Sequence, residues 1–360
     1  MANKSILFII GSAEIGGTEK QTVRLARELI DRGWDARIWF TSSGGPLTAE
    51  CIEFGIPFKV YSIRFRNPRF IFSTCRNLIS LIVKIIKLRP SIIQSQLTES
   101  ILVYLNIARV FARKSKRVAG VRGFTPKLGF VARKLFVSAL KKASAVICNS
   151  PHLVTDVENF TRSTNSNIHC IYNGVDISNI GEISRYELPN AVVVSNLHPY
   201  KGFMVLIESL KLVKEDVSIR ICGSGPMEEE ILIAVNRNNL GKKIEIVPRP
   251  ANVDYEIKKA SFAIHPSETE GLSNAILEEI AGGLPVIAFD VGGNNLLVKD
   301  LWNGFIIAPG DISSLAKAID VLSSDPKMRK KLGKNSLLLA QKFDWEICAT
   351  KYEEIYSSFH

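Results

Sequence analysis

The 360-residue sequence has few cysteines, no long apolar run and, over one long segment, almost no acidic residues. Its six cysteines are dispersed and form no C-x-x-C pair, which argues against a zinc cluster and favours a reducing compartment. No uninterrupted apolar stretch reaches the length of about 18 residues that a membrane-spanning helix needs. The run Ile6–Ile10 is too short for the apolar part of a signal peptide and predicts a buried first strand.

The formal net charge of the whole sequence is +11, but the excess of positive charge is concentrated in one part of the chain. Residues 54–155 contain nineteen Lys and Arg and one acid, Glu99, whereas the segments before and after are net acidic. A protein that binds nucleic acid over its whole surface is not expected to show this distribution. The cationic clusters alternate with apolar residues, as in Arg64-Phe65-Arg66, which suits the headgroup region of an anionic membrane. An ordinary solvated basic face is the alternative.

Short apolar runs alternate with helical patterns in both halves of the sequence, which predicts parallel sheets covered by helices. A polar, weakly periodic stretch at 177–190 is interpreted as a linker between an N-terminal domain, 1–176, and a second domain, 191–343. The fold class is therefore α/β, with two Rossmann-like domains facing a cleft. In such sheets, ligands bind beyond the carboxyl ends of the strands.

Two loops in these positions carry residues suited to phosphate. Gly16 and Gly17 lie between a predicted strand and helix, where free backbone N–H groups favour an anion; a tight turn is the alternative. The loop lacks the G-x-G-x-x-G pattern of a dinucleotide site. Lys201, followed by Gly202, comes after the strand 191–197 and can reach a phosphate as a point charge; a solvated lysine at a helix start is the alternative.

The most informative segment is 266–279, which follows a predicted strand and opens a helix. Glu270 lies in the loop and Glu278 about one turn inside the helix, on the same face as Asn274. A carboxylate in this position can accept hydrogen bonds from both hydroxyls of a ribose, while backbone N–H groups take phosphate or sugar oxygens. The alternative is that Glu278 and Glu279 are exposed helix residues and Glu270 is a capping acid.

The E-x7-E pattern, preceded by Pro266-Ser267 and followed by Ala-Gly-Gly-Leu-Pro-Val, resembles the family 4 glycosyltransferases. The resemblance extends over most of the chain. Its other elements are Gly16-Gly17, Asn173-Gly174-Val175-Asp176, Lys201-Gly202, Cys222-Gly223-Ser224-Gly225-Pro226, Gly292-Gly293 and Phe343-Asp344-Trp345-Glu346. It implies the GT-B fold, with a C-terminal helix, 344–360, that crosses back to the N-terminal domain.

By this resemblance, Glu270 contacts the donor sugar, Lys201 the diphosphate and Glu278 the ribose hydroxyls. Catalytic roles are predicted for Glu270, Lys201 and Arg122. The other predicted donor-binding residues are Glu278, Gly16, Gly17, Asn196, Gly223, Arg249, Gly271, Leu272, Ser273 and Asn274.

Two of the departures from the family affect the positive charge available to a phosphate. Asn196 stands where the family usually has an Arg five residues before its phosphate-binding Lys, and an amide cannot neutralise a phosphate. Arg122 stands in a loop where the family often has a His. Another cation is expected to compensate for the missing Arg, the candidates being Arg122, His198 and Arg249.

The resemblance implies a retaining hexosyltransferase that moves a sugar from a nucleotide-diphosphate sugar, a UDP-sugar rather than a GDP-sugar, to a lipid-linked or oligosaccharide acceptor. Neither a metal nor another cofactor is expected. The predicted role is surface polysaccharide or glycolipid assembly, in the cytoplasm at the inner face of the membrane, with segment 54–155 on the anionic surface. A nucleotide-sugar 2-epimerase of similar fold, or a non-catalytic relative that binds membranes or nucleic acid, remains an alternative.

Overall fold

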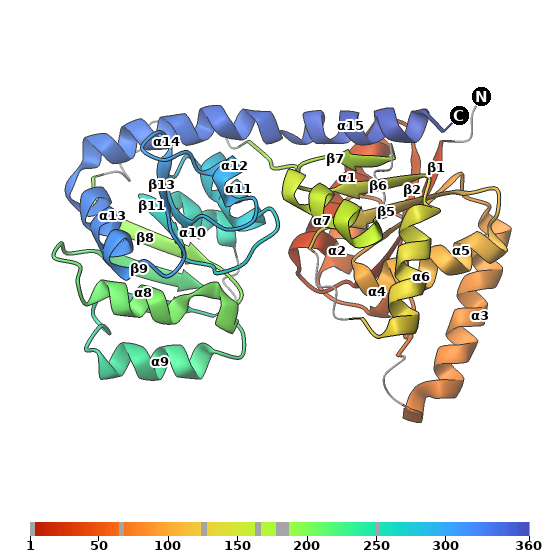
Figure 1. Cartoon of the computed structure of the whole chain (residues 1–360), viewed down its shortest axis with the longest axis horizontal. Coiled ribbons are helices and arrows are strands. Elements are labelled where there is room, and N and C mark those ends of the chain that lie inside the picture. The colour runs from red at the N-terminus through yellow and green to blue at the C-terminus, as the bar shows by residue number, and fades with distance from the viewer. Residues whose placement is uncertain are drawn as a thin grey trace. The chain divides into compact units, whose positions relative to one another are not determined.

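The structure is a computed structural model that describes residues 4–64, 68–123, 128–162, 167–177, 187–248 and 252–359. The chain divides into two compact units, Met1–Gly174 with Trp345–His360 and Val175–Asp344 (Figure 1). We call them the N-terminal and the C-terminal unit. The division falls two residues before the predicted end of the first domain. Of the predicted linker, 178–186 lie outside the described residues.

The described residues of the N-terminal unit form a seven-stranded parallel sheet in the order β3-β2-β1-β4-β5-β6-β7. The first strand, β1 (Ser5–Ser12), lies between β2 and β4, and its apolar run is entirely buried because helices cover both faces of the sheet. The other strands are β2 (Asp35–Ser43), β3 (Phe58–Val60), β4 (Ile92–Gln96), β5 (Lys116–Val121), β6 (Ala145–Cys148) and β7 (Ile168–Cys170).

Each face of this sheet has its own apolar core. One core lies under α1 (Gly17–Asp31), α2 (Leu47–Glu53) and α15 (Trp345–Ser357). The other lies under a longer series of helices. These are α3 (Ile71–Leu88), η2 (Ile101–Leu105), α5 (Asn106–Phe111), α6 (Phe130–Lys141) and α7 (Pro151–Thr161), with η1 (Pro68–Phe70) before α3 and α4 (Thr98–Ser100) before η2.

The last helix, α15, belongs to the N-terminal unit, so the predicted return of the C-terminal helix is confirmed. Trp345, Tyr352 and Tyr356 of α15 are buried in the same core as α1. The indole of Trp345 lies so close to the backbone of Gly174 that a Cβ there would overlap the ring. The glycine of the Asn173-Gly174 motif is therefore required where the chain leaves this unit.

The C-terminal unit has a six-stranded parallel sheet in the order β10-β9-β8-β11-β12-β13. Its strands are again short apolar runs that helices bury on both faces. They are β8 (Asn190–Val194), β9 (Ser218–Cys222), β10 (Ile244–Val247), β11 (Phe262–His265), β12 (Val286–Phe289) and β13 (Gly304–Ile307).

Helices α8 (Phe203–Leu210), α9 (Glu228–Arg237) and α13 (Ile312–Ser324) share one core with this sheet. Helix α10 (Val253–Lys259) packs against β8 and α11 (Asn274–Ala281), and α14 (Pro326–Ala340) packs against α11. The short elements are η4 (Pro199–Lys201), α12 (Asn294–Leu297) and η5 (Gln341–Phe343).

The prediction of two α/β, Rossmann-like domains is confirmed by the two parallel sheets and their helices. Both sheets have the strand order of a doubly wound fold, in which neighbouring loops meet at the carboxyl edge. In the described parts of the chain, no helix is long and apolar enough to cross a membrane.

Candidate active site

The loops that follow β8, β9, β11 and β12 meet at the carboxyl edge of the C-terminal sheet because all its strands run in the same direction. Glycines allow their backbones to touch. Gly202 has a φ of +73°, and a Cβ there would overlap the carbonyl oxygen of Pro266. Gly292 has a φ of +54°, and a Cβ there would overlap the carbonyl oxygen of Glu270. The amide of Glu268 also donates to the carbonyl of Tyr200, over 2.8 Å. The four loops therefore form one packed assembly.

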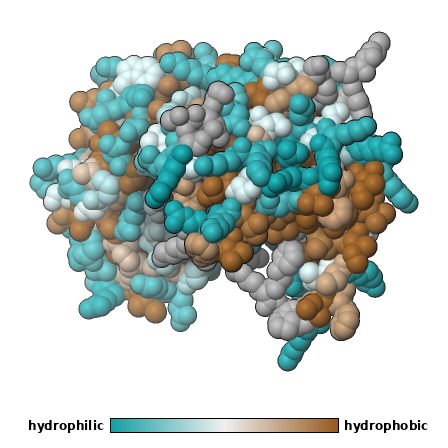
Figure 2. All heavy atoms as spheres, turned by 45° about the vertical axis from the view of Figure 1, so that its right-hand side comes forward, coloured by the Kyte–Doolittle hydropathy of each residue, from teal (hydrophilic) through white to brown (hydrophobic). Residues whose placement is uncertain are grey.

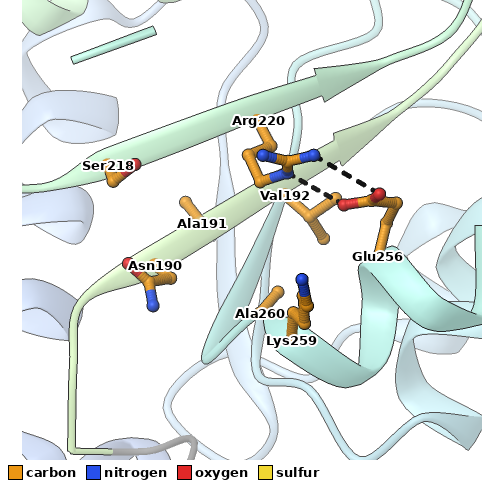
Figure 3. Close-up of a pocket in the computed structure, with 8 residues that line it drawn as sticks. All are labelled: Asn190, Ala191, Val192, Ser218, Arg220, Glu256, Lys259 and Ala260. Atoms are coloured by element: carbon orange, nitrogen blue, oxygen red, sulfur yellow. Dashed lines mark hydrogen bonds and ion pairs between the residues drawn. The ribbon is translucent and has the colours of Figure 1, made fainter. Parts of the chain in front are cut away.

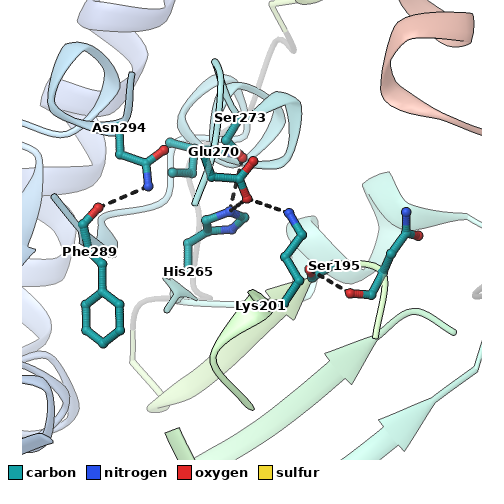
Figure 4. A network of polar contacts seen from close by, with 9 residues as sticks. Ser195, Lys201, His265, Glu270, Ser273, Phe289 and Asn294 are labelled. Atoms are coloured by element: carbon teal, nitrogen blue, oxygen red, sulfur yellow. Dashed lines mark hydrogen bonds and ion pairs between the residues drawn. The ribbon is translucent and has the colours of Figure 1, made fainter. Parts of the chain in front are cut away.

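Three charged or polar side chains converge in this assembly (Figure 4). The Nζ of Lys201 donates to Oε1 of Glu270 over 2.5 Å, and Nε2 of His265 lies 3.0 Å from the same oxygen. The side chains of Lys201 and Glu270 are 14% and 13% exposed, and that of His265 only 2%. Lys201 is therefore not the solvated lysine of the alternative interpretation.

Glu270 is held as a carboxylate. Burial by itself would raise its pKa, but the hydrogen bond and charge of His265, together with Lys201, lower the pKa to about 2. Since an ionised carboxylate only accepts hydrogen bonds, Nε2 of His265 must carry the proton that it donates to Glu270. Sequence reasoning missed His265. The available signal was a polar residue at the end of an apolar strand, five residues before Glu270.

The N-terminus of α11 lies beside this cluster. Ser273 caps the helix by accepting from the amide of Ile276, and its Oγ is 3.2 Å from Nε2 of His265. The alternative prediction, that Glu270 caps this helix, is therefore wrong. Gly271 accepts a hydrogen bond from the amide of Gly293, over 2.7 Å, and Leu272 has a buried side chain, so both can act only through their backbone.

Asn274 and Glu278 are half-buried on the first turns of α11, as the predicted helix requires. Glu279, in contrast, is fully buried, which contradicts the alternative that both glutamates are exposed. Burial and the neighbouring charge of Glu278 raise the pKa of Glu279 well above its usual range, more than the backbone of Val194 lowers it. The charged form of Glu279 is thus disfavoured next to the half-buried Glu278.

The loops after β8 and β9 contribute two further predicted residues. Asn196 is exposed, and its backbone oxygen accepts from the amide of His198 over 2.9 Å. The ring of His198 stacks on Tyr200, one residue before Lys201, with the ring centroids 5.7 Å apart. A Cβ on Gly223 would overlap the carbonyl of Ser195, so this glycine allows the two loops to pack. Arg249 lies outside the described residues.

In the N-terminal unit, Gly16 and Gly17 occupy the start of α1. Gly16 is the N-cap residue, without a side-chain cap, and Gly17 is the first helical residue. The 15-residue helix therefore presents its first backbone N–H groups at the carboxyl edge of its own sheet, where the carboxylate of Glu19 also lies close to Gly16. This geometry suits the predicted anion site as well as the tight turn.

Arg122, predicted to be catalytic, is engaged on all three nitrogens by side chains of the N-terminal unit. Its Nε donates to Gln96 over 3.0 Å, one terminal nitrogen to Asn173, and the other to the hydroxyl of Tyr352 over 2.7 Å. Gln96 in turn donates to Thr22 of α1 over 2.7 Å. Arg122, just after β5, is thus connected to the end of β4, to Asn173 and to α15, and through Gln96 to α1.

A pocket of about 230 Å³ lies in the C-terminal unit at the opposite end of β8 and β9, away from the Lys201–Glu270 cluster (Figure 3). The guanidinium of Arg220 crosses it to the carboxylate of Glu256, 2.8 Å away, and so connects β9 to α10. The charges of Arg220 and Glu256 in this pocket therefore neutralise each other. Within the described residues, no group of three His, Cys, Asp or Glu side chains could hold a metal ion.

Both halves of the chain match models of glycosyltransferase families. Residues 15–179 match the model described as Glycosyltransferase Family 4, and residues 184–337 match Glycosyl transferases group 1. The chain belongs to the glycosyltransferases. The second model contains every residue of the Lys201, His265 and Glu270 cluster.

Individual relatives agree with this family. A glycosyltransferase of Haemophilus influenzae without an assigned reaction is 24% identical over 94% of this chain and 96% of its own length. A Campylobacter jejuni N-acetylgalactosaminyltransferase, whose name gives a diphospho-undecaprenol acceptor, is 26% identical over 66% of this chain and 68% of its own. Anabaena HepE in complex with UDP and glucose superimposes with a TM-score of 0.85, at 21% identity, over 99% of this chain and 100% of that one. This last likeness concerns the fold alone.

Proposed function

We propose that this glycosyltransferase transfers a hexose from a UDP-sugar, with retention of configuration, to a lipid-linked or oligosaccharide acceptor. The observation that carries the proposal is the cluster of Lys201, Glu270 and His265 beside the N-terminus of α11. A cation and a row of backbone N–H groups suit the diphosphate of a nucleotide-sugar. The UDP complex of the HepE structure and the lipid-linked acceptor of the Campylobacter relative support the choice of substrates.

Each residue has a distinct proposed role. Lys201 stabilises the negative charge that develops on the departing diphosphate, together with the backbone N–H groups of residues 271–274. Glu278 accepts hydrogen bonds from the ribose hydroxyls. Because burial raises the pKa of the neighbouring Glu279, a second negative charge beside Glu278 is disfavoured. Glu270 orients the donor sugar by accepting from its hydroxyls.

Glu270 is a poor general acid, since a pKa of about 2 leaves it without a proton at neutral pH. We therefore propose that Glu270 orients the sugar. The acceptor hydroxyl forms its bond to the anomeric carbon on the same face from which the diphosphate leaves, and its proton passes to the departing diphosphate oxygen. No metal is required, because Lys201 and the helix N-terminus supply the positive charge.

The acceptor and location follow from the basic segment. We propose that residues 54–155 hold the enzyme at the anionic inner face of the membrane, where a lipid-linked acceptor is presented. The product then belongs to the assembly of a surface polysaccharide or glycolipid.

The proposal is tested by incubating the purified chain with UDP- and GDP-sugars and a diphospho-polyprenol-linked saccharide, and reading the product by NMR. We expect transfer from a UDP-sugar, with the anomeric configuration of the donor retained and no effect of a chelator. An inverted product, a trapped glycosyl-enzyme or conversion of the donor to its 2-epimer without acceptor would each contradict the proposal. Glu278→Gln should weaken UDP binding, whereas Glu268→Gln, at an exposed position of the loop before α11, should not.

A further inference from the structure

Helix α3 is apolar on two opposite faces. Its inner face buries Leu81 and Ile85 in the core of the N-terminal unit. A surface helix of a water-soluble domain normally has one apolar stripe, with polar residues on the opposite side. The outer face of α3 does not follow this pattern.

The outer face carries four large apolar side chains spaced seven, four and three residues apart, which places them on one stripe of a helix. Phe72 is 90% exposed and Ile79 is 61% exposed. Val83 and Ile86 complete the stripe at 42% and 44%. This stripe has no partner among the described residues that would bury it.

A second group of exposed apolar residues lies at the start of α6. Phe130 is 72% exposed and Val131 is 68% exposed. Helices α3 and α6 cover the same core, and both begin at the carboxyl edge of the sheet because each connects two parallel strands. Figure 2 shows apolar surface gathered over the part of the N-terminal unit that carries α3, bordered by hydrophilic residues.

Cations surround these apolar residues. Nζ of Lys134 lies 4.2 Å from the ring centroid of Phe130, and the guanidinium of Arg64 lies 4.8 Å from that of Phe70, which is in η1, two residues before Phe72. Arg76 and Lys87 are exposed on α3 itself. With one acid in the whole segment 54–155, this rim is complementary to an anionic surface.

We propose that Phe72, Ile79, Val83, Ile86, Phe130 and Val131, here called the apolar ridge, insert into the headgroup region of an anionic bilayer. This goes beyond attachment of segment 54–155 by charge, because burial of apolar area resists salt whereas charge attraction does not. The inference is independent of the donor chemistry. Insertion would bring the carboxyl edge of the N-terminal sheet against the membrane, where a lipid-linked molecule is within reach.

Vesicle co-sedimentation tests the apolar ridge directly. The chain is mixed with phosphatidylcholine vesicles with and without phosphatidylglycerol, at low and high salt. We expect the chain to bind only vesicles that contain the anionic lipid, and part of this binding to persist at high salt. Phe72→Ser with Ile79→Ser should lower the bound fraction about five-fold at both salt concentrations. The matched control, Leu232→Ser with Ile233→Ser, changes two residues that are similarly exposed on α9 and should bind as the wild type does.

Unchanged binding of the ridge variant would overturn the inference. So would a wild-type dimer in light scattering that the ridge variant converts to a monomer, since a second copy would then cover the ridge. If the double variant fails to fold, Phe72→Trp keeps the position apolar. Its added fluorescence should be quenched by brominated lipid, and no quenching would equally reject insertion. UDP-induced thermal stabilisation of the same variants reports on the donor site separately.

Discussion

The two units share one architecture but present different chemistry at the carboxyl edges of their sheets. In the C-terminal unit, Lys201 reaches this edge and pairs with Glu270 in loops that glycines allow to pack. In the N-terminal unit, Arg122 lies after β5 at the same edge of its sheet and is hydrogen-bonded to Gln96, Asn173 and Tyr352. The same fold therefore yields a charged cluster in one unit and a structural connection in the other. What differs is which partners surround the cation.

The outer surfaces differ as well. The N-terminal unit exposes an apolar ridge with a basic rim, whereas the part of the chain from residue 156 onward is net acidic. We infer a division of labour, in which the C-terminal unit binds the donor and the N-terminal unit faces the membrane and the acceptor. The following predictions test this comparison in order of decreasing effect.

Removing the cation of the C-terminal unit is expected to have the largest effect. Lys201→Ala should lower kcat/KM by about 10²–10³-fold, because it removes one preorganised charge from the leaving diphosphate. Lys211→Ala is the matched control, since Lys211 is exposed and pairs only with its helix neighbour Glu208 in the structure. Equal activity of the two variants in a transfer assay would remove Lys201 from the mechanism.

A side chain at Gly202 is expected to disrupt the packing of the loops. Gly202→Ala adds a Cβ that overlaps the Pro266 carbonyl at a positive φ, which should cost about 2–4 kcal/mol of unfolding free energy. Gly129→Ala, at a position with open space and a negative φ, serves as control. Urea unfolding measures both. Similar midpoints for the two variants would show that close contact between these loops is unnecessary.

The Lys201–Glu270 pair should make the stability of the chain sensitive to acid. Because the pKa of Glu270 is lowered to about 2 in the folded state, its contribution is present above the unfolded-state pKa and is lost as the pH falls. Between about pH 5 and pH 3, the wild type should lose on the order of 2 kcal/mol more stability than Glu270→Gln. Parallel pH curves from urea unfolding would contradict this, and Glu268→Gln should follow the wild type.

Arg122 should affect stability without affecting the donor. Arg122→Lys cannot reach Gln96, Asn173 and Tyr352 together, so we expect a loss of about 1–2 kcal/mol in unfolding free energy. UDP affinity, measured by calorimetry, should stay within about two-fold of the wild type, because Arg122 and the Lys201–Glu270 cluster share no hydrogen-bond partner among the described residues. A large fall in UDP affinity at unchanged stability would return Arg122 to the donor site and break the comparison between the units.

Much of the fold could be predicted from sequence because buried parallel strands appear as short apolar runs between helical patterns. The loop residues Lys201 and Glu270 could be placed for the same reason, since each follows such a run. In the N-terminal unit, the helices between α1 and α15 were not predicted individually, and between residues 98 and 111 η2 and α5 interrupt the regular helical period. His265 was missed because it completes an apolar strand.

The partners of Arg122 could not be predicted, because Tyr352 is 230 residues away in sequence and is brought close only by the return of α15. The apolar ridge was also invisible in the sequence. A helix with two apolar faces is typical of a buried helix, and only the structure shows that one face of α3 has no cover among the described residues.

Hydrogen–deuterium exchange of the full chain, measured alone, with UDP and with anionic vesicles, tests the division of labour most directly. We predict that UDP protects the loops around Lys201 and Glu270 and the start of α11, while vesicles protect α3 and the start of α6. The account would be contradicted by UDP protection confined to the N-terminal unit, or by vesicle protection that leaves α3 unchanged.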